Sequence, residues 1–186
     1  DDSGRFSVGD WSVSQTEAEH RVSVGRIHDR IARGETYQVN HTFRIRMPFD
    51  GDPLSLFRAL VRWQPESLAA YVDFGDVVIC SASPELMFSL DGNRVVSRPM
   101  KGTAVRGHDP ATDAEREEWL RSSEKNRAEN AMIVDMVRND LGRVAEAGTV
   151  EVTGRFEIER HPTVLQMTST IEARTDAPVA EIVAAL

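Results

Sequence analysis

The spacing of hydrophobic residues predicts a helix near the start of the chain. Val24, Ile27 and Ile31 recur at intervals of three and four residues, as on one face of a helix. The sequence SQTE at residues 14–17 matches a capping box, and Gly34 lies where a glycine commonly ends a helix. We therefore expect a helix that begins at this box and ends at Gly34.

After this helix the hydrophobic period changes to two, which is typical of a strand with one buried face. Several further apolar runs are strand-like, and two pairs of them are joined by turn sequences at residues 75–76 and 91–93. The expected strands lie at residues 36–46, 69–75, 76–83, 85–90, 94–99, 149–154, 155–160 and 163–173. Longer periodic stretches predict helices at residues 52–63, 108–121, 124–141 and 178–186.

The order of these elements limits the possible fold classes. Strands and helices are mixed without a regular strand–helix–strand alternation, which favours an α+β fold with a mixed or antiparallel sheet and flanking helices. Residues 1–13 are a polar lead-in, and residues 14–186 contain no linker, repeat or low-complexity tract. We expect one domain, or part of one, over residues 14–186.

Composition narrows the possible partners. The 186 residues are 40% hydrophobic and 28% charged, as in ordinary globular domains. A net charge of −8 argues against nucleic acid or an anionic membrane as the main partner, because both attract cationic surfaces. The single cysteine, Cys80, excludes an intrachain disulfide, and no apolar run is long enough to span a membrane. We expect a cytoplasmic protein.

One stretch is positively charged, although the chain as a whole has a net charge of −8. The sequence RPMKGTAVRG at residues 98–107 holds three cationic side chains and no carboxylate. Its proline restricts the backbone, and its glycines permit conformations that other residues avoid. The Lys101 side chain is therefore expected to point in a defined direction. Composition alone indicates a cationic turn, whose lysine either binds an anion or reacts itself. A solvated charge run is the simpler alternative.

Two carboxylates stand out by their positions. Glu85 follows Pro84 directly and opens an expected strand, although a strand-start glutamate is usually a surface residue. Glu129 shares a helix face with Met132 and Ile133, so it must be paired, bound to a metal or placed at the edge of a cleft. A boundary residue that forms an ion pair with Arg127, Arg138 or another cation is the simpler interpretation.

Several common site motifs are missing. The sequence has no GxGxxG, GxxxxGK[ST] or GxSxG motif, and its five histidines show no metal-binding spacing such as HExxH. A nucleotide site, a zinc site and a serine-hydrolase site therefore have no motif support.

Five segments together resemble the chorismate-utilising enzymes, which include anthranilate, aminodeoxychorismate and isochorismate synthases. They occur in the family's order. The segments are IARGETYQVN (31–40), SASPELMF (81–88), RPMKGTAVRG (98–107), SEKNRAENAMIVDMVRNDLGRV (123–144) and TVLQMTSTIEA (163–173). The resemblance implies that residues 14–186 are the N-terminal portion of a single chorismate-binding domain, half of an anthranilate-synthase-like fold.

The resemblance also implies roles for individual residues. Glu129 matches a glutamate that coordinates Mg²⁺, which in turn holds the ring carboxylate of chorismate. Glu85 matches the general acid that protonates the departing C4 hydroxyl. The expected substrate contacts are Gly102, Thr103, Arg106 and Gln166. A possible regulatory pocket for an amino acid involves Tyr37, Gln38 and Asn40.

Lys101 discriminates within the family. Anthranilate synthases resemble PIAGT at this position, whereas aminodeoxychorismate synthases resemble PMKGT, as this chain does at residues 99–103. The resemblance implies that Lys101 attacks ring C2 as the C4 hydroxyl leaves, and that ammonia then attacks C4 and displaces the lysine. The ammonia comes from a glutamine amidotransferase subunit or domain, and the product leads to 4-aminobenzoate and folate.

The chain also departs from the family pattern. Gln166 stands where many members carry a histidine over the substrate, and the expected C-terminal half with its second Mg²⁺-binding glutamate is absent. We therefore expect the 186 residues alone to be inactive. Two alternatives stay open: an anthranilate or isochorismate synthase, and a non-catalytic module that docks an amidotransferase or binds an amino acid.

Overall fold

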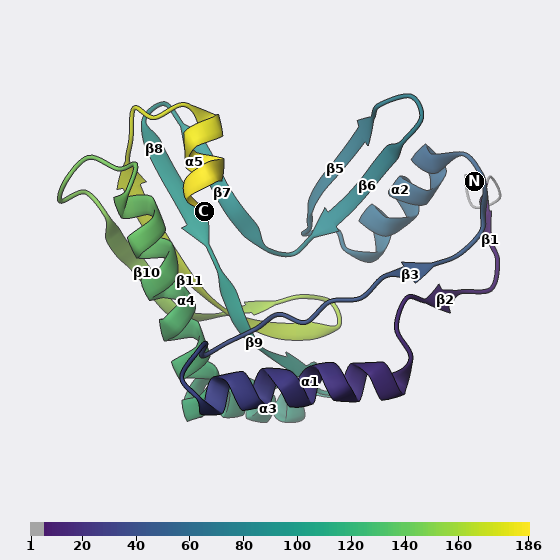
Figure 1. Ribbon diagram of the computed structural model, residues 1–186, viewed down its shortest axis with the longest axis horizontal. Helices are drawn as coiled ribbons and strands as arrows, with labels where there is room; N and C mark the ends of the chain where they lie inside the picture. The colour runs from purple at the N-terminus through teal and green to yellow at the C-terminus, as the bar shows by residue number, and fades with distance from the viewer. Residues whose placement is uncertain (1–5) are drawn as a thin grey trace. The chain divides into compact units, whose positions relative to one another are not determined.

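A computed structural model describes residues 6–186 of the chain (Figure 1). Its backbone divides into two compact units, Asp1–Ala59 and Leu60–Leu186. Helix α2, Pro53–Trp63, crosses this boundary and matches the helix expected over residues 52–63. Each unit is described separately.

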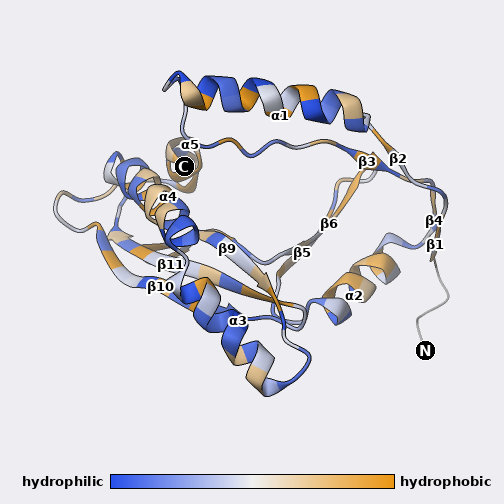
Figure 2. Cartoon of the chain, turned by 90° about the horizontal axis from the view of Figure 1, so that it is seen from below, coloured by the Kyte–Doolittle hydropathy of each residue, from blue (hydrophilic) through white to orange (hydrophobic). Residues whose placement is uncertain are grey.

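The described part of the first unit contains one long helix and short two-stranded ladders. β1 (Phe6–Val8) pairs with β4 (Phe49–Gly51), and β2 (Ser12–Val13) pairs with β3 (Ile45–Arg46), both antiparallel. α1 spans Glu17–Ala32. Hydrophobic residues recur along α1 among hydrophilic ones (Figure 2), but none of its residues is buried.

The start of α1 corrects the predicted cap. Thr16 is the N-cap residue: its side chain accepts a hydrogen bond from the Glu19 N–H, and the Glu19 carboxylate accepts one from the Thr16 N–H at 2.8 Å. The hydroxyl of Ser14 instead accepts from the Arg44 N–H at 2.8 Å. The sequence holds two overlapping motifs of the capping-box type, and the second caps the helix because the first serine is bonded to a distant segment. Gly34, at φ 72°, follows the helix end as predicted.

The strand predicted over residues 36–46 is wrong for most of its length. Only Ile45–Arg46 forms a ladder, and residues 36–44 adopt no regular structure (Figure 1). Tyr37, Val39 and Phe43 are exposed, so the alternating apolar side chains do not bury one face. Alternation predicts a strand only where a partner strand is present, and within residues 6–186 this segment has none.

The second unit is built on an antiparallel sheet of five strands. These are β7 (Leu86–Asp91), β8 (Arg94–Arg98), β9 (Met100–Val105), β10 (Glu151–Arg160) and β11 (Val164–Arg174). The strand order is β10-β11-β8-β7, and β9 pairs with β11 beyond the end of β8. β5 (Leu68–Asp73) and β6 (Val78–Ser83) form a separate hairpin.

Three helices accompany this sheet: α3 (Pro110–Ser122), α4 (Glu124–Gly142) and α5 (Val179–Ala185). α4 contacts β9, β10 and β11, and α3 contacts the same three strands. All ladders among the described strands are antiparallel. The predicted α+β class with an antiparallel sheet and flanking helices is therefore confirmed. The strands expected at 149–154 and 155–160 are one strand, β10, with irregular pairing around Gly154.

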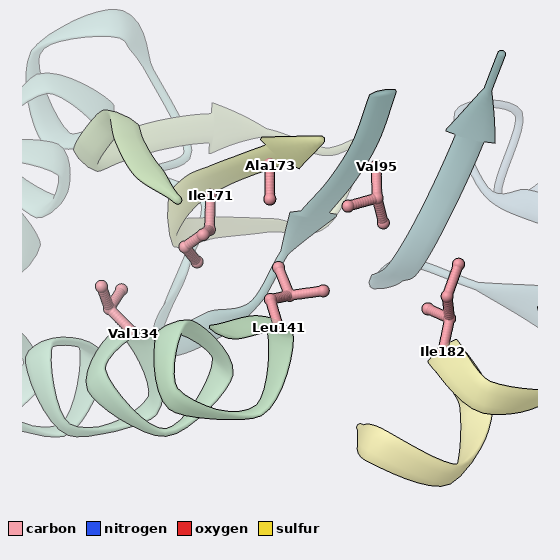
Figure 3. Packing of buried hydrophobic residues seen from close by; sticks show 6 residues of the cluster. All are labelled: Val95, Val134, Leu141, Ile171, Ala173 and Ile182. Atoms are coloured by element: carbon pink, nitrogen blue, oxygen red, sulfur yellow. The ribbon is translucent and has the colours of Figure 1, made fainter. Parts of the chain in front are cut away.

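Burial of apolar side chains between the helices and one sheet face stabilises this unit. Figure 3 shows that side chains from β8 and β11 point towards those of α4, with one from α5 beside them. This cluster comprises Val95, Val134, Leu141, Ile171, Ala173 and Ile182. A second cluster, Ala104, Leu120, Leu165 and Met167, joins β9 and β11 to α3. Fully burying one such leucine or isoleucine is worth about 1.5–3 kcal/mol.

A buried amide ties α4 to β11. Asn130 is fully buried, its Nδ2 donates to the Met167 carbonyl at 3.2 Å, and its Oδ1 accepts from the Ser169 hydroxyl at 2.6 Å. The Ser169 hydroxyl in turn accepts from the Phe156 N–H at 3.1 Å. One side chain therefore links a helix to two neighbouring strands.

Replacing Asn130 with leucine is expected to lower the free energy of unfolding by about 2–3 kcal/mol, because it leaves buried polar partners unsatisfied. Urea unfolding followed by circular dichroism measures the loss. The matched control is Asn139→Leu, at an exposed position of the same helix, where the change should stay within about 0.5 kcal/mol. Equal losses in the two variants would contradict the structural role of the amide.

Candidate active site

Lys101, Gly102 and Thr103 lie on strand β9, which corrects the expectation of a turn. Opposite them on β11, Gln166 faces Thr103, whereas Thr168 faces Met100, so β9 carries one extra residue between these pairs. Gly102 has φ 100°, a conformation that glycine adopts without strain. This β-bulge explains why a strand contains the glycine that suggested a turn. A bulge also changes the direction of the side chains around it, here beside Lys101.

Gly102 also brings β9 close to the start of α4. A Cβ atom at this position would lie 3.0 Å from the Asn126 Cβ and 3.2 Å from the Leu120 Cδ1. Asn126 itself is buried, and its Nδ2 donates to the hydroxyl of Ser123, the N-cap residue of α4, at 3.1 Å. The glycine is therefore required for packing, independently of any substrate contact.

The Glu85 carboxylate is hydrogen-bonded to the backbone of Met100, the residue before Lys101. Its Oε1 accepts a hydrogen bond from the Met100 N–H at 2.9 Å, and its own N–H donates to the Ser83 hydroxyl at 3.2 Å. Glu85 is exposed and Lys101 is half-buried. One carboxylate oxygen of Glu85 is thus bonded to the chain neighbour of Lys101, the other residue expected to catalyse the reaction.

Glu129 lies on α4, three residues after Asn126, which contacts Gly102. Its Oε1 is 3.3 Å from the Lys125 Nζ, and its side chain is 29% exposed. This is the paired boundary residue that the pattern suggested, with Lys125 as the cation. Within residues 6–186 no three or more His, Cys, Asp or Glu side chains form a group that could hold a metal. One accessible carboxylate fits Mg²⁺, which often takes one or two protein carboxylates and keeps several waters.

The guanidinium of Arg106 is occupied by protein partners. Its Nε and Nη2 donate to the two carboxylate oxygens of Asp113 at 2.8 and 2.7 Å, and its Nη1 donates to the His161 carbonyl at 2.8 Å. The Gly107 N–H donates to Asp113 as well, at 2.8 Å. This geometry supports a structural role in holding β9 to α3 and to the β10–β11 turn, and a contact with substrate stays a prediction.

The same bonds change the acidity of Asp113. The Arg106 guanidinium and the Gly107 N–H lower the pKa of this carboxyl from 3.8 to about 2. Because the folded state favours the ionised form, the pair contributes its full stability above about pH 4 and loses it as the pH falls towards 2.

We expect Asp113→Asn to unfold more readily than the unaltered chain at pH 7, with the difference shrinking between pH 4 and pH 2. Urea midpoints at pH 7, 4, 3 and 2.5 measure this. The control is Asp135→Asn, whose carboxylate is 78% exposed on α4. A gap between Asp113→Asn and the unaltered chain that stays constant down to pH 2.5 would contradict the assignment.

Gln166 lies in the middle strand of its part of the sheet, opposite Thr103 on one side and Glu159 on the other. It lines a pocket of about 180 Å³ in the second unit. Its Oε1 is buried and has no hydrogen-bond partner among the described residues.

The three residues of the possible regulatory pocket lie in the first unit. Tyr37 is 63% exposed, and the Gln38 carbonyl accepts a hydrogen bond from the Thr36 hydroxyl at 3.2 Å. The groove found in this unit is lined by α1 and by residues 14, 15, 42 and 43, not by Tyr37, Gln38 or Asn40. A regulatory role for these three residues stays a prediction.

Sequence reasoning missed residues that shape the site. Asn126 and Asn130 recur four residues apart on α4 and are both buried, which a polar pair at helical spacing within an apolar seam could have indicated. Asp113 and His161 gave no such signal: Asp113 lies on α3, seven residues after Arg106 and beyond a turn, and His161 lies 55 residues away.

Comparisons with known proteins give one family. The family model described as chorismate binding enzyme matches residues 1–186. An aminodeoxychorismate synthase of Streptomyces pristinaespiralis is 46% identical over 162 residues, which cover 86% of this chain and 22% of the relative. The anthranilate synthase component 1 of Neisseria meningitidis serogroup B is 39% identical over 158 residues, covering 85% and 32%.

Solved structures share the fold. The anthranilate synthase component I from Streptococcus pneumoniae has a TM-score of 0.84 and 28% identity, covering 97% of this chain and 40% of its own. A putative 2,3-dihydroxybenzoate-specific isochorismate synthase, DhbC from Bacillus anthracis, has a TM-score of 0.82 at 21% identity, covering 98% and 51%. The chain thus spans 22–32% of the curated relatives and about half or less of these structures. No helix within residues 6–186 is long and apolar enough to cross a membrane.

Proposed function

Because this chain belongs to the chorismate binding enzyme family, we propose that it forms part of component I of an aminodeoxychorismate synthase. Lys101 is the observation that carries the proposal. It occupies the one position that separates the lysine-bearing synthases from the alanine-bearing ones in the resemblance drawn above. Two aminodeoxychorismate synthases at 46% and 45% identity support this choice; a third, at 37%, is no more similar than the anthranilate synthases at 38–41%.

In the proposed reaction Lys101 is the nucleophile and Glu85 the general acid. The neutral amine of Lys101 forms a bond to ring C2 of chorismate while the C4–O bond breaks. Glu85 donates the proton that lets the hydroxyl leave as water. Ammonia then forms a bond to C4, the bond between C2 and the lysine nitrogen breaks, and 4-amino-4-deoxychorismate is released.

The Glu85 geometry supports this division of roles. Its Oε1 is bonded to the Met100 N–H, which fixes the carboxyl group beside Lys101 and leaves Oε2 to carry a proton. The bulge at Lys101 and Gly102 gives the lysine a conformation that an uninterrupted strand would not provide.

We further propose that Glu129 binds Mg²⁺ together with the substrate carboxylate. The metal would supply positive charge to a dianionic substrate, which an overall charge of −8 otherwise repels. Glu129 would hold the ion through the carboxylate that is paired with Lys125 in this structure. Ammonia comes from a glutamine amidotransferase. Since the chain spans 22–32% of its curated relatives, we propose that the 186 residues alone do not turn over chorismate.

Product analysis tests the proposal. The complete reading frame that contains this chain is incubated with chorismate, Mg²⁺ and an ammonium salt, and the products are separated by chromatography. We expect 4-amino-4-deoxychorismate as the main product. If anthranilate or isochorismate is the main product, the protein is an anthranilate or isochorismate synthase instead. No conversion of chorismate would favour a non-catalytic module.

A further inference from the structure

Two histidines from separate segments meet in the first unit. After α1 the chain turns at Gly34, and residues 36–44 run back beside the helix (Figure 1). This return places the His41 ring against His20 of α1, with 5.3 Å between the ring centroids and 53° between the ring planes. Phe43 contacts His20 edge-on, at 6.1 Å between centroids. Both imidazoles are half-buried. Because they lie on different segments, no sequence spacing indicated the pair.

A chain of hydrogen bonds determines which nitrogen of His41 carries the proton. The Ser23 hydroxyl donates to the Glu19 carbonyl at 3.0 Å, and it accepts from the Gln15 Nε2 at 2.9 Å. The Gln15 amide therefore presents its Oε1 to the His41 Nε2, at 3.0 Å, and an amide oxygen can only accept. The proton of the neutral His41 ring is thus on Nε2, and Nδ1 is left with a lone pair.

This arrangement is typical of a histidine that binds a metal ion. The nitrogen that does not bind the metal commonly donates to an oxygen, which fixes the tautomer and the direction of the ring. The separation of the two rings also fits a shared ion. Zinc–nitrogen distances are about 2.0–2.1 Å, so two imidazoles bound at a tetrahedral angle have centroids about 5 Å apart. The 5.3 Å between the His20 and His41 centroids agrees with this value.

The first unit has few other contacts that could hold α1 in place. Among its described residues no hydrophobic side chain is buried, and Ser55 of α2 is the only buried residue. Small units that lack a core often rely on a metal ion or a disulfide. The single cysteine, Cys80, lies outside this unit. An ion bound by His20 and His41 would join α1 to the returning segment and close the loop between them.

We propose that His20 and His41 bind a transition-metal ion such as Zn²⁺, Ni²⁺ or Cu²⁺, for which imidazole is a preferred ligand. Two imidazoles are fewer than the three protein ligands sought above, so water molecules complete the coordination. The site differs from the Mg²⁺ position proposed at Glu129, which lies in the second unit and offers an oxygen ligand. It does not depend on the proposed function.

Nuclear magnetic resonance of the 186-residue chain with labelled histidine rings tests the proposal. The chain is freed of metal with a chelator, then titrated at pH 7.5 with zinc chloride or, at equal ionic strength, with magnesium chloride. We expect the signals of His20 and His41 to shift until one Zn²⁺ is bound per chain. The other three histidines, His28, His108 and His161, should not shift, and Mg²⁺ should have no effect. At pH 6 saturation should require more Zn²⁺, because protons compete for the ring nitrogens.

Variants of the two ligands provide the decisive comparison. His20→Gln and His41→Gln should each weaken Zn²⁺ binding at least tenfold, because one nitrogen ligand is lost. His28→Gln, at an exposed position of the same helix, is the matched control and should bind normally. Gln15→Ala keeps both imidazoles but removes the hydrogen bond to His41, and it should weaken binding about ten- to a hundredfold. If a histidine variant fails to fold by circular dichroism, Gln15→Ala provides the comparison.

Three results would overturn the proposal. The first is no saturable binding of Zn²⁺, which is expected if the two rings only pack against each other. The second is a set of Zn²⁺-dependent shifts confined to His28, His108 or His161. The third is an affinity for Zn²⁺ in folded His20→Gln and His41→Gln variants equal to that of His28→Gln.

Discussion

Replacing Lys101 with alanine is expected to lower aminodeoxychorismate formation by a factor of about a thousand or more in the complete synthase that carries this chain, because it removes the covalent route. The residual reaction should move towards amination at C2, since ammonia can attack that carbon directly once no lysine occupies it. Chromatography of the products and the two rates measure both effects. No other substitution proposed for this chain should change the identity of the product.

Lys101→Arg separates nucleophilic from electrostatic roles. Arginine keeps the positive charge but stays protonated and cannot attack the ring. We expect this variant to be as inactive as the alanine variant, while circular dichroism and the urea midpoint remain near those of the parent protein. Recovery of aminodeoxychorismate formation by arginine would mean that the position contributes charge alone. Full activity of Lys101→Ala would remove the lysine from the mechanism.

Glu85→Gln is expected to reduce kcat by about a hundred- to ten-thousandfold, the usual contribution of a general acid. The glutamine can still accept the Met100 N–H through its oxygen, so the local backbone contact is retained while the transferable proton is lost. KM for chorismate should change little. Steady-state kinetics of the complete protein, with Glu181→Gln on the exposed side of α5 as control, measure the difference. A kcat within tenfold of the parent value would exclude Glu85 as the acid.

The sequence predicted most elements of the second unit because their patterns are local. The hairpins at residues 69–83 and 85–99 combine β-rich runs with turn sequences, and both are present in the structure. The helix expected over 124–141 begins at the Ser123 cap and ends one residue later than predicted. In these segments the sequence preference and the tertiary packing agree.

The wrong predictions concern segments whose structure is determined by long-range contacts. The irregular path of residues 36–44 depends on the lack of a partner strand, which no local pattern reports. The bulge in β9 depends on pairing with Gln166 and Thr168, more than sixty residues away. The helix cap also lies two residues later than predicted, at Thr16, because the Ser14 hydroxyl accepts a hydrogen bond from the Arg44 N–H.

The site was predictable in its residue types and less so in its contacts. The resemblance singled out Glu85 and Lys101 together, and the Glu85–Met100 hydrogen bond joins their segments. It gave no indication that the Arg106 guanidinium is fully engaged by Asp113 and His161, because that arrangement appears only when α3 and the β10–β11 turn lie against β9.

Mass spectrometry of a trapped intermediate tests the central claim most directly. The complete protein is mixed with chorismate and Mg²⁺ without ammonia, quenched and digested. This chain contains two lysines, Lys101 and Lys125, so the second is an internal control. We predict that the peptide with Lys101 gains the mass of chorismate minus one water and that the peptide with Lys125 is unchanged. Aminodeoxychorismate formation on adding ammonia, with no such adduct on Lys101 beforehand, would contradict the covalent mechanism.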